Sequence, residues 1–201
     1  RAILDETMRN LYHGVPLDEV YKSAILSARA LIEKDPAYSQ VTARLLMDTL
    51  RAEALGFLGV AEAATHHEMA DLYAKALPAY VEKGAEFELL DPKLKEYDLE
   101  KLGRAINHER DQQFTYLGLQ TLYDRYFLHV RKTRIELPQS FFMRVAMGLA
   151  IEAAADEIIW CCEQSGPGLA PRRVSDRSIT GTVVDGLSAW ADEGSPTPFR
   201  F

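Results

Sequence analysis

The stretch that decides the fold runs from Asn107 to Glu152 and reads NHERDQQFTYLGLQTLYDRYFLHVRKTRIELPQSFFMRVAMGLAIE. Its pattern predicts a helix, a two-stranded hairpin and a second long helix. In the first helix, apolar residues recur at helical spacing and share one face, which we expect to be buried: Leu119, Leu122, Tyr123 and Tyr126. The stretch contains almost nothing typical of a reaction centre.

The hairpin and the second helix follow from the residues after this helix. Segments 126–130 and 133–137 alternate in character on either side of Arg131-Lys132, which predicts two half-buried strands joined by a polar turn. The turn has neither Gly nor Asn, so its type stays open. Pro138 suits the first turn of a helix, and apolar residues then recur at steps of three and four: Phe142, Val145 and Leu149.

Three helices packed side by side are predicted upstream. The first covers 2–11 and ends before Gly14, a residue suited to a left-handed C-cap. The second begins at Pro16, has acidic residues in its first turn (Asp18 and Glu19) and an apolar stripe (Tyr21, Ile25, Ala28 and Ile32). The third covers roughly 38–55. It is expected to turn Val41, Leu45 and Leu46 inward and to expose Arg44, Arg51 and Glu53.

The middle of the chain predicts two further helices. Thr65 and Glu68 match a capping box at the start of the first, whose core side carries Met69, Leu72, Tyr73, Ala76, Leu77 and Tyr80. Pro78 should kink this helix and Gly84 should end it. Asp91-Pro92 should then open a helix over 93–106.

Composition and charge limit the classes of function. The chain has 201 residues, 47% of them hydrophobic and 26% charged, which is typical of a globular protein with a real core. A formal net charge of −7 argues against general binding to nucleic acid or to an anionic membrane. No apolar run approaches a membrane span and no leader is recognisable, so we expect a cytoplasmic protein. Cys161 and Cys162 are adjacent and offer no disulfide framework.

The order of residues from Arg110 to Leu149 resembles the N-terminal helical domain of the large (alpha) subunit of class I ribonucleotide reductase. The residues that carry the resemblance are Arg110, Asp111, Phe114, Tyr116, Gly118, Thr121, Leu122, Arg125 and Tyr126, and then Pro138, Gln139, Met143, Arg144, Val145, Gly148 and Leu149. We expect the resemblance to cover 1–152 and to fail after that. It implies a parent reaction, the reduction of ribonucleoside diphosphates for DNA precursor synthesis.

A second resemblance precedes the first. Residues 11–47, LYHGVPLDEVYKSAILSARALIEKDPAYSQVTARLLM, are similar to the last helices of the ATP-cone, an allosteric nucleotide-binding module. Functional cones tend to carry a Thr and a His four apart where this chain has Leu17 and Tyr21, and the phosphate-contacting hairpin of the cone is not in this sequence. We therefore expect a truncated cone that binds no nucleotide.

Three further groups could carry chemistry. His66-His67-Glu68 suggests a metal, but adjacent helical histidines point about 100° apart and make a poor chelate, so a solvated helix start is preferred. For His108, Glu109, Arg110 and Asp111 a structural ion-pair and capping cluster is preferred over acid–base catalysis. Cys161-Cys162 matches no reductase cysteine, and Arg172-Arg173 is too short for a nucleic-acid patch.

These observations combine into one prediction. The fold is mainly α, a helical bundle-like domain with one small β-hairpin and an irregular C-terminal tail. Its parts are the end of a cone-like module (1–55), the reductase N-terminal helical domain (56–152), and the end of a long helix with an atypical tail (153–201). We expect no catalytic, cofactor-binding or metal-binding residue in the chain, and no activity of the chain alone.

The resemblance also implies partners and cofactors for the parent family. These are a small (beta) subunit with a metal-radical cofactor, other alpha subunits, and ATP or dATP as effectors. We expect no nucleic-acid or membrane partner, whereas self-association into a homo-oligomer is compatible with the long apolar helix faces. The alternative from another class is a stand-alone helical interaction or regulatory module without enzymatic activity.

Overall fold

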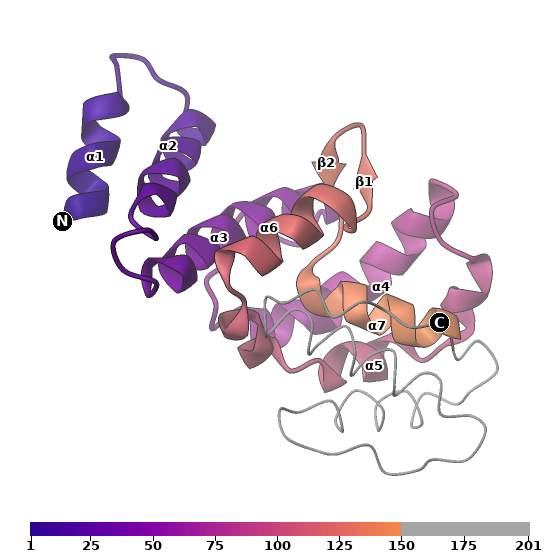
Figure 1. The fold of residues 1–201 in the computed structure, drawn as a ribbon. Coiled ribbons are helices and arrows are strands. Elements are labelled where there is room, and N and C mark those ends of the chain that lie inside the picture. Colours follow the sequence, from indigo (N-terminus) through magenta and orange to yellow (C-terminus); the bar gives the residue numbers. More distant parts are fainter. Residues whose placement is uncertain (150–201) are drawn as a thin grey trace, which may run out of the picture.

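The computed structural model describes residues 1–149. Over this range the chain is mainly helical with one two-stranded antiparallel sheet, so the predicted fold class is confirmed (Figure 1). The elements are α1 (Ala2–Asn10), α2 (Leu17–Ala30), α3 (Tyr38–Leu58), α4 (Met69–Glu86), the 3-10 helix η1 (Pro92–Glu96), α5 (Leu99–Ala105), the 3-10 helix η2 (His108–Gln113), α6 (Tyr116–Arg125), β1 (His129–Val130), β2 (Thr133–Arg134) and α7 (Pro138–Leu149). The tail predicted over 153–201 lies outside the described residues.

One hydrophobic cluster joins α3 to α7, and α1 and α2 stand at one end of the molecule, beyond α3 (Figure 1). Helix α4 forms the centre of this core. The face predicted for α4 is confirmed, because Met69, Tyr73, Ala76, Leu77 and Tyr80 are all buried and Leu72 is half-buried. The helix runs through Pro78.

The ends of α4 differ from the prediction. Glu68 does reach back to Thr65, whose N–H and Oγ1 both donate to Glu68 Oε2 at 2.7 Å, but the α-helix itself begins at Met69. Gly84 does not end the helix, which continues to Glu86. The absence of a side chain at Gly84 instead lets Leu90 pack closely, since a Cβ at this position would lie 2.5 Å from Leu90 Cδ1.

The hairpin is shorter than predicted but lies where it was expected. Only His129↔Arg134 and Val130↔Thr133 pair, around a turn in which Arg131 has φ 47° and Lys132 has φ 76°. Positive φ at both central residues is the geometry of a type I′ turn, here formed without Gly or Asn. The segments 126–130 and 133–137 are therefore not strands over their whole lengths.

Helix α6 lies before the hairpin. The buried face predicted for it is confirmed at the centre of the helix but not at its end. Leu119 and Leu122 are buried, and Tyr123 is half-buried. The prediction that Tyr126 is buried is wrong, because this residue is 50% exposed. It follows the last helical residue, Arg125, and so the helical period no longer governs where its side chain points.

Four predictions for the chain before η2 need correction. Helix α1 ends at Asn10, so Gly14 is not its C-cap. Gly14 lies in the loop that follows and has a positive φ of 81°. Pro16 is the N-cap of α2 and not its first residue, and Tyr21, placed in the apolar stripe, is 48% exposed. The helix expected over 93–106 is split into η1 and α5, because the Asp98 side chain accepts from Lys101 N–H and starts a new helix.

Of the three α3 residues that were predicted to face inward, one is buried and the other two are not. Leu46 is buried and Arg44 is exposed, as predicted, but Val41 is 37% exposed and Leu45 is half-buried. The larger error concerns two charged residues that were expected on the surface. Arg51 is buried and Glu53 is half-buried, and both face other elements of the domain.

Candidate functional site

A buried polar cluster around Asp111 is the candidate functional site. It begins with Arg51 on α3, whose side chain is only 4% exposed. Its guanidinium lies between two carboxylates: Nη1 donates to Asp48 Oδ1 at 3.1 Å, and Nη2 lies 3.9 Å from Asp111 Oδ2. Burying a cation is costly unless anions accompany it, and these two carboxylates offset that cost.

Asp111 on η2 connects four elements. Tyr73 Oη from α4 donates to its Oδ2 at 2.9 Å, and Gln139 Nε2 from α7 donates to its Oδ1 at 3.0 Å, while Arg51 approaches from α3. Burial raises the pKa of Asp111, although the hydrogen bonds from Gln139 and Tyr73 oppose that shift. Burial, and next the nearby Asp111 charge, raise the pKa of the Tyr73 hydroxyl well above its usual value.

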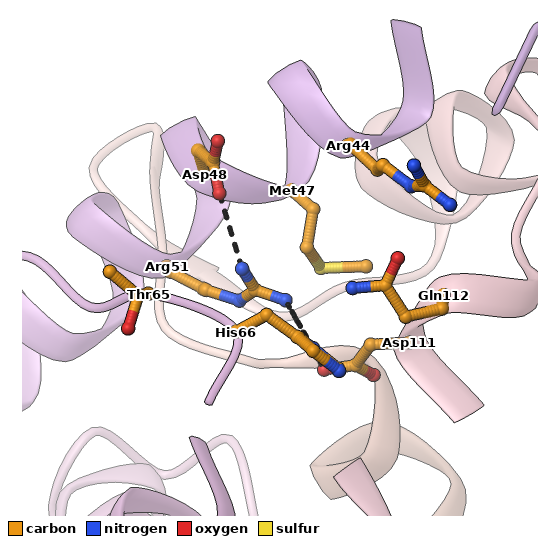
Figure 2. Close-up of a pocket in the computed structure, with 8 residues that line it drawn as sticks. All are labelled: Arg44, Met47, Asp48, Arg51, Thr65, His66, Asp111 and Gln112. Carbon is orange, nitrogen blue, oxygen red and sulfur yellow. Dashed lines mark hydrogen bonds and ion pairs between the residues drawn. The ribbon is translucent and has the colours of Figure 1, made fainter. Parts of the chain in front are cut away.

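A pocket of about 290 Å³ opens beside this cluster (Figure 2). It is lined by Arg44, Met47, Asp48, Arg51, Thr65, His66, Asp111 and Gln112. Figure 2 shows Arg51 reaching from α3 toward Asp111, with His66 beside them and the Met47 side chain between the two arginines. The two arginines of the pocket lining are balanced by two carboxylates, those of Asp48 and Asp111.

A second buried carboxylate, Glu136, holds the hairpin against α4 and α7. Its side chain is fully buried. Oε1 accepts from Tyr80 Oη at 2.6 Å and from Arg144 Nε at 2.6 Å, and Oε2 accepts from Leu128 N–H at 2.9 Å. Burial, and next the Glu136 charge, raise the pKa of Tyr80 well above its usual value.

Glu53 forms a third contact, between α3 and the hairpin. Its Oε2 accepts from Tyr123 Oη at 2.7 Å, and its Oε1 accepts from Arg134 N–H. Arg134 also stacks over the Tyr123 ring, with 4.5 Å between the guanidinium carbon and the ring centroid. The half-buried Glu53 therefore fixes one strand of the hairpin to the longest described helix.

These clusters have the chemistry of structural supports. Nucleophilic catalysis needs a hydroxyl or thiol beside a free base, and acid–base catalysis needs a group that can reach substrate. The oxygens of Asp111 and Glu136 instead accept from protein donors on several elements. The predicted structural role of Asp111 is consistent with these contacts.

The structure places the other candidate residues as follows. The ring centroids of His66 and His67 lie 5.7 Å apart, and the fold also brings His66 to His108, with ring centroids 5.0 Å apart. His66 Nε2 and His108 Nε2 each lie 3.2 Å from an oxygen of Glu109. Sequence reasoning missed this convergence, because residues 66 and 108 share no local pattern. Cys161-Cys162 and Arg172-Arg173 lie outside the described residues.

Two positions bear on the cone-like module. Leu17 and Tyr21 on α2 are 68% and 48% exposed.

The helices within residues 1–149 were compared with the length and apolar character of a membrane span, and none of them has both.

Comparison with known proteins gives a consistent family. Residues 112–180 match the family model described as the ribonucleotide reductase all-alpha domain. The match continues past Glu152, so the expectation that the resemblance fails there is wrong.

Curated relatives agree. The chain is 39% identical over 160 residues to the ribonucleoside-diphosphate reductase subunit alpha of Chlamydia pneumoniae, and the match covers 80% of this chain and 15% of that protein. It is 36% identical over 138 residues to the ribonucleoside-diphosphate reductase subunit alpha of Helicobacter pylori strain 26695, and the match covers 68% of this chain and 16% of that protein. It is 26% identical over 155 residues to the ribonucleoside-diphosphate reductase large subunit of Caenorhabditis elegans, and the match covers 74% of this chain and 18% of that protein.

The chain thus spans about 15% of the length of the first of these relatives. Two residues that carry the resemblance, Asp111 and Gln139, are hydrogen-bonded at the centre of the buried cluster, and a third, Arg144, holds Glu136. The helix, hairpin and helix that decided the fold therefore lie in the all-alpha domain of the ribonucleotide reductase large-subunit family, to which this chain belongs.

Proposed function

We propose that this chain supplies the non-catalytic helical part of a ribonucleoside-diphosphate reductase alpha subunit, which converts ribonucleoside diphosphates to deoxyribonucleoside diphosphates. The observation that carries the proposal is the corner from η2 to α7, where residues of the family pattern lock together through Asp111 and Glu136. A rigid corner of this kind is suited to supporting a catalytic domain, because packed helices hold their relative positions far better than loops do.

An activity assay tests the non-catalytic role. The 201-residue chain is mixed with a reductase small subunit, CDP, an effector nucleotide and a reductant, and deoxycytidine diphosphate is measured. We expect no product above the mixture without the chain, because reduction needs redox-active cysteines and a substrate phosphate site, and the described clusters offer neither. A full-length alpha subunit serves as the positive control. Turnover by the chain would overturn the proposal.

The partners proposed are those of the parent enzyme. They are the small subunit, which holds the metal-radical cofactor, and other alpha subunits. Pull-down of a tagged chain with a full-length alpha subunit and with a small subunit separates these two, and binding to neither would argue for a purely internal support.

We propose the division of the chain into a cone-like part (1–55) and a helical domain that begins at residue 56 and, because the family match covers 112–180, extends beyond residue 152. Residue 55 lies inside α3, which runs from Tyr38 to Leu58, so the first two parts share a helix. Calorimetry with ATP and dATP tests whether the cone-like part senses nucleotides. We expect no heat of binding, because the exposed Leu17 and Tyr21 offer no cationic side chain to phosphate. Saturable heat would show an allosteric site.

A second function, that of a helical interaction module, is favoured by one observation. Helices α1 and α2 and the loop between them expose several large apolar side chains: Leu4, Met8, Tyr12, Leu17, Tyr21 and Leu26. Exposed apolar groups of this size commonly mark a surface that another protein covers. Light scattering after size exclusion distinguishes a monomer from an oligomer. A concentration-independent monomer that binds no alpha subunit would argue against this function.

A further inference from the structure

We propose that His66, His108 and Glu109 form a binding site for one zinc ion, which would tie the segment before α4 to η2. The three residues come from parts of the chain more than forty positions apart and converge at one point on the surface. One ligand atom from each lies within 4.8 Å of the other two. This inference goes beyond the proposed function and does not depend on it.

The donor set suits zinc. Zn²⁺ in proteins prefers imidazole nitrogen, thiolate sulfur and carboxylate oxygen, with bonds of about 2.0–2.2 Å. Neighbouring ligands of a tetrahedral ion with such bonds are about 3.3 Å apart. His66 Nε2 lies 3.2 Å from Glu109 Oε2 and His108 Nε2 lies 3.2 Å from Glu109 Oε1, so each imidazole already stands at this distance from one oxygen of the same carboxylate.

The surroundings leave room for an ion. The two imidazoles are mostly buried, with side chains 15% and 20% exposed, and the Glu109 side chain is 63% exposed. Two ligands are thus held by packing while the third can adjust, and the solvent side can supply water as a fourth ligand.

One contact opposes the site. Arg51 Nη2 lies 3.4 Å from His66 Nδ1, and because arginine can only donate, this contact gives Nδ1 the acceptor role and leaves the hydrogen on Nε2. Zinc on Nε2 displaces that hydrogen and moves the imidazole N–H to Nδ1, so the contact with Arg51 must open. At 3.4 Å it is near the limit of a hydrogen bond, and we expect a metal bond to replace it.

Zinc binding to the full chain tests the proposal. Cys161 and Cys162 are replaced by Ser in every variant, since thiolates bind zinc on their own. Competition with a chromophoric chelator at neutral pH gives stoichiometry and affinity, and Co²⁺ as a probe reports tetrahedral coordination by its visible spectrum. We expect one ion per chain, with affinity lowered at least about tenfold by His108→Gln and by Glu109→Gln.

His67→Gln is the matched control, because His67 is an exposed histidine adjacent in sequence and outside the cluster. It should bind zinc as the parent does. Equal loss in His67→Gln and His108→Gln, or no loss in either, would overturn the proposal.

A measurement on the parent chain guards against variants that fail to fold. Long-range ¹H–¹⁵N spectra of the imidazoles should show the Nε2 signals of His66 and His108 shifting together on adding one equivalent of Zn²⁺, while those of His13, His67 and His129 stay in place. Shifts spread over all five histidines would mean adventitious binding only and would reject the site.

Discussion

At the scale of single residues, the buried carboxylate of Asp111 controls how α3, α4, η2 and α7 meet. Asp111→Asn keeps the shape of the side chain but removes the negative charge beside Arg51 and one acceptor for Tyr73 or Gln139. Because hydrogen bonds to charged groups contribute about 1.5–3 kcal/mol each, we expect the free energy of unfolding to fall by about 2–3 kcal/mol. Urea denaturation followed by circular dichroism measures the change.

The matched control is Asp124→Asn on α6. Asp124 is exposed and accepts from Gln120 on the same helix at 2.8 Å. Surface contacts of this kind contribute little, so its effect should stay below about 0.5 kcal/mol. Equal effects of the two substitutions would contradict the role given to the Asp111 cluster.

At the scale of elements, the contact between α4 and α5 depends on a glycine. A Cβ on Gly103 would lie 2.8 Å from the Ala74 Cα, which is backbone and cannot swing aside. We expect Gly103→Ala to lower the free energy of unfolding by about 1–3 kcal/mol, despite the better helix propensity of alanine.

Gly56→Ala on α3 provides the opposite case. No atom lies within 4 Å of the added Cβ. The substitution should raise the free energy of unfolding by up to about 1 kcal/mol through helix propensity alone. Thermal denaturation of both variants checks the opposite signs, and destabilisation by Gly56→Ala would show that exposed helix positions here are constrained in another way.

The start of α4 makes a pH-dependent contribution to stability. The hydrogen bonds from the Thr65 N–H and hydroxyl lower the pKa of Glu68 below that of the unfolded chain. A lowered carboxyl pKa stabilises the folded state above the unfolded value, near pH 4.3, and this contribution is lost as pH falls through the folded pKa. The stability difference between the parent and Glu68→Gln should therefore be present at pH 7 and be lost in acid, as the pH falls below the unfolded value and through the lowered folded pKa. A difference independent of pH would contradict this mechanism.

At the scale of the whole molecule, stability should be unevenly distributed. Helix α1 buries one residue, Thr7, and it packs against α2, whereas α4 contributes Met69, Tyr73, Leu77 and Tyr80 to the core. Amide hydrogen exchange follows local opening, which is easiest where few side chains are buried. We expect the amides of α1 to exchange orders of magnitude faster than those of central α4. Similar protection in both would mean that a partner or a second copy covers α1.

The sequence by itself located the main helices and the hairpin. Helical spacing of apolar residues located α4, α6 and α7 and the buried faces of α4 and of the centre of α6, and Pro138 marked the first residue of α7, because these signals act within a few residues along the chain. The order of residues from Arg110 to Leu149 was also enough to indicate the family.

Only the tertiary structure decided what the charged residues do. Arg51 and Glu53 were expected on the surface because charged side chains are rarely buried, yet both face partners contributed by distant segments. The meeting of His66 with His108 has the same cause. A local pattern shows which residues share a face, but the partner that compensates a charge, or completes a ligand set, is supplied by whichever element packs against that face.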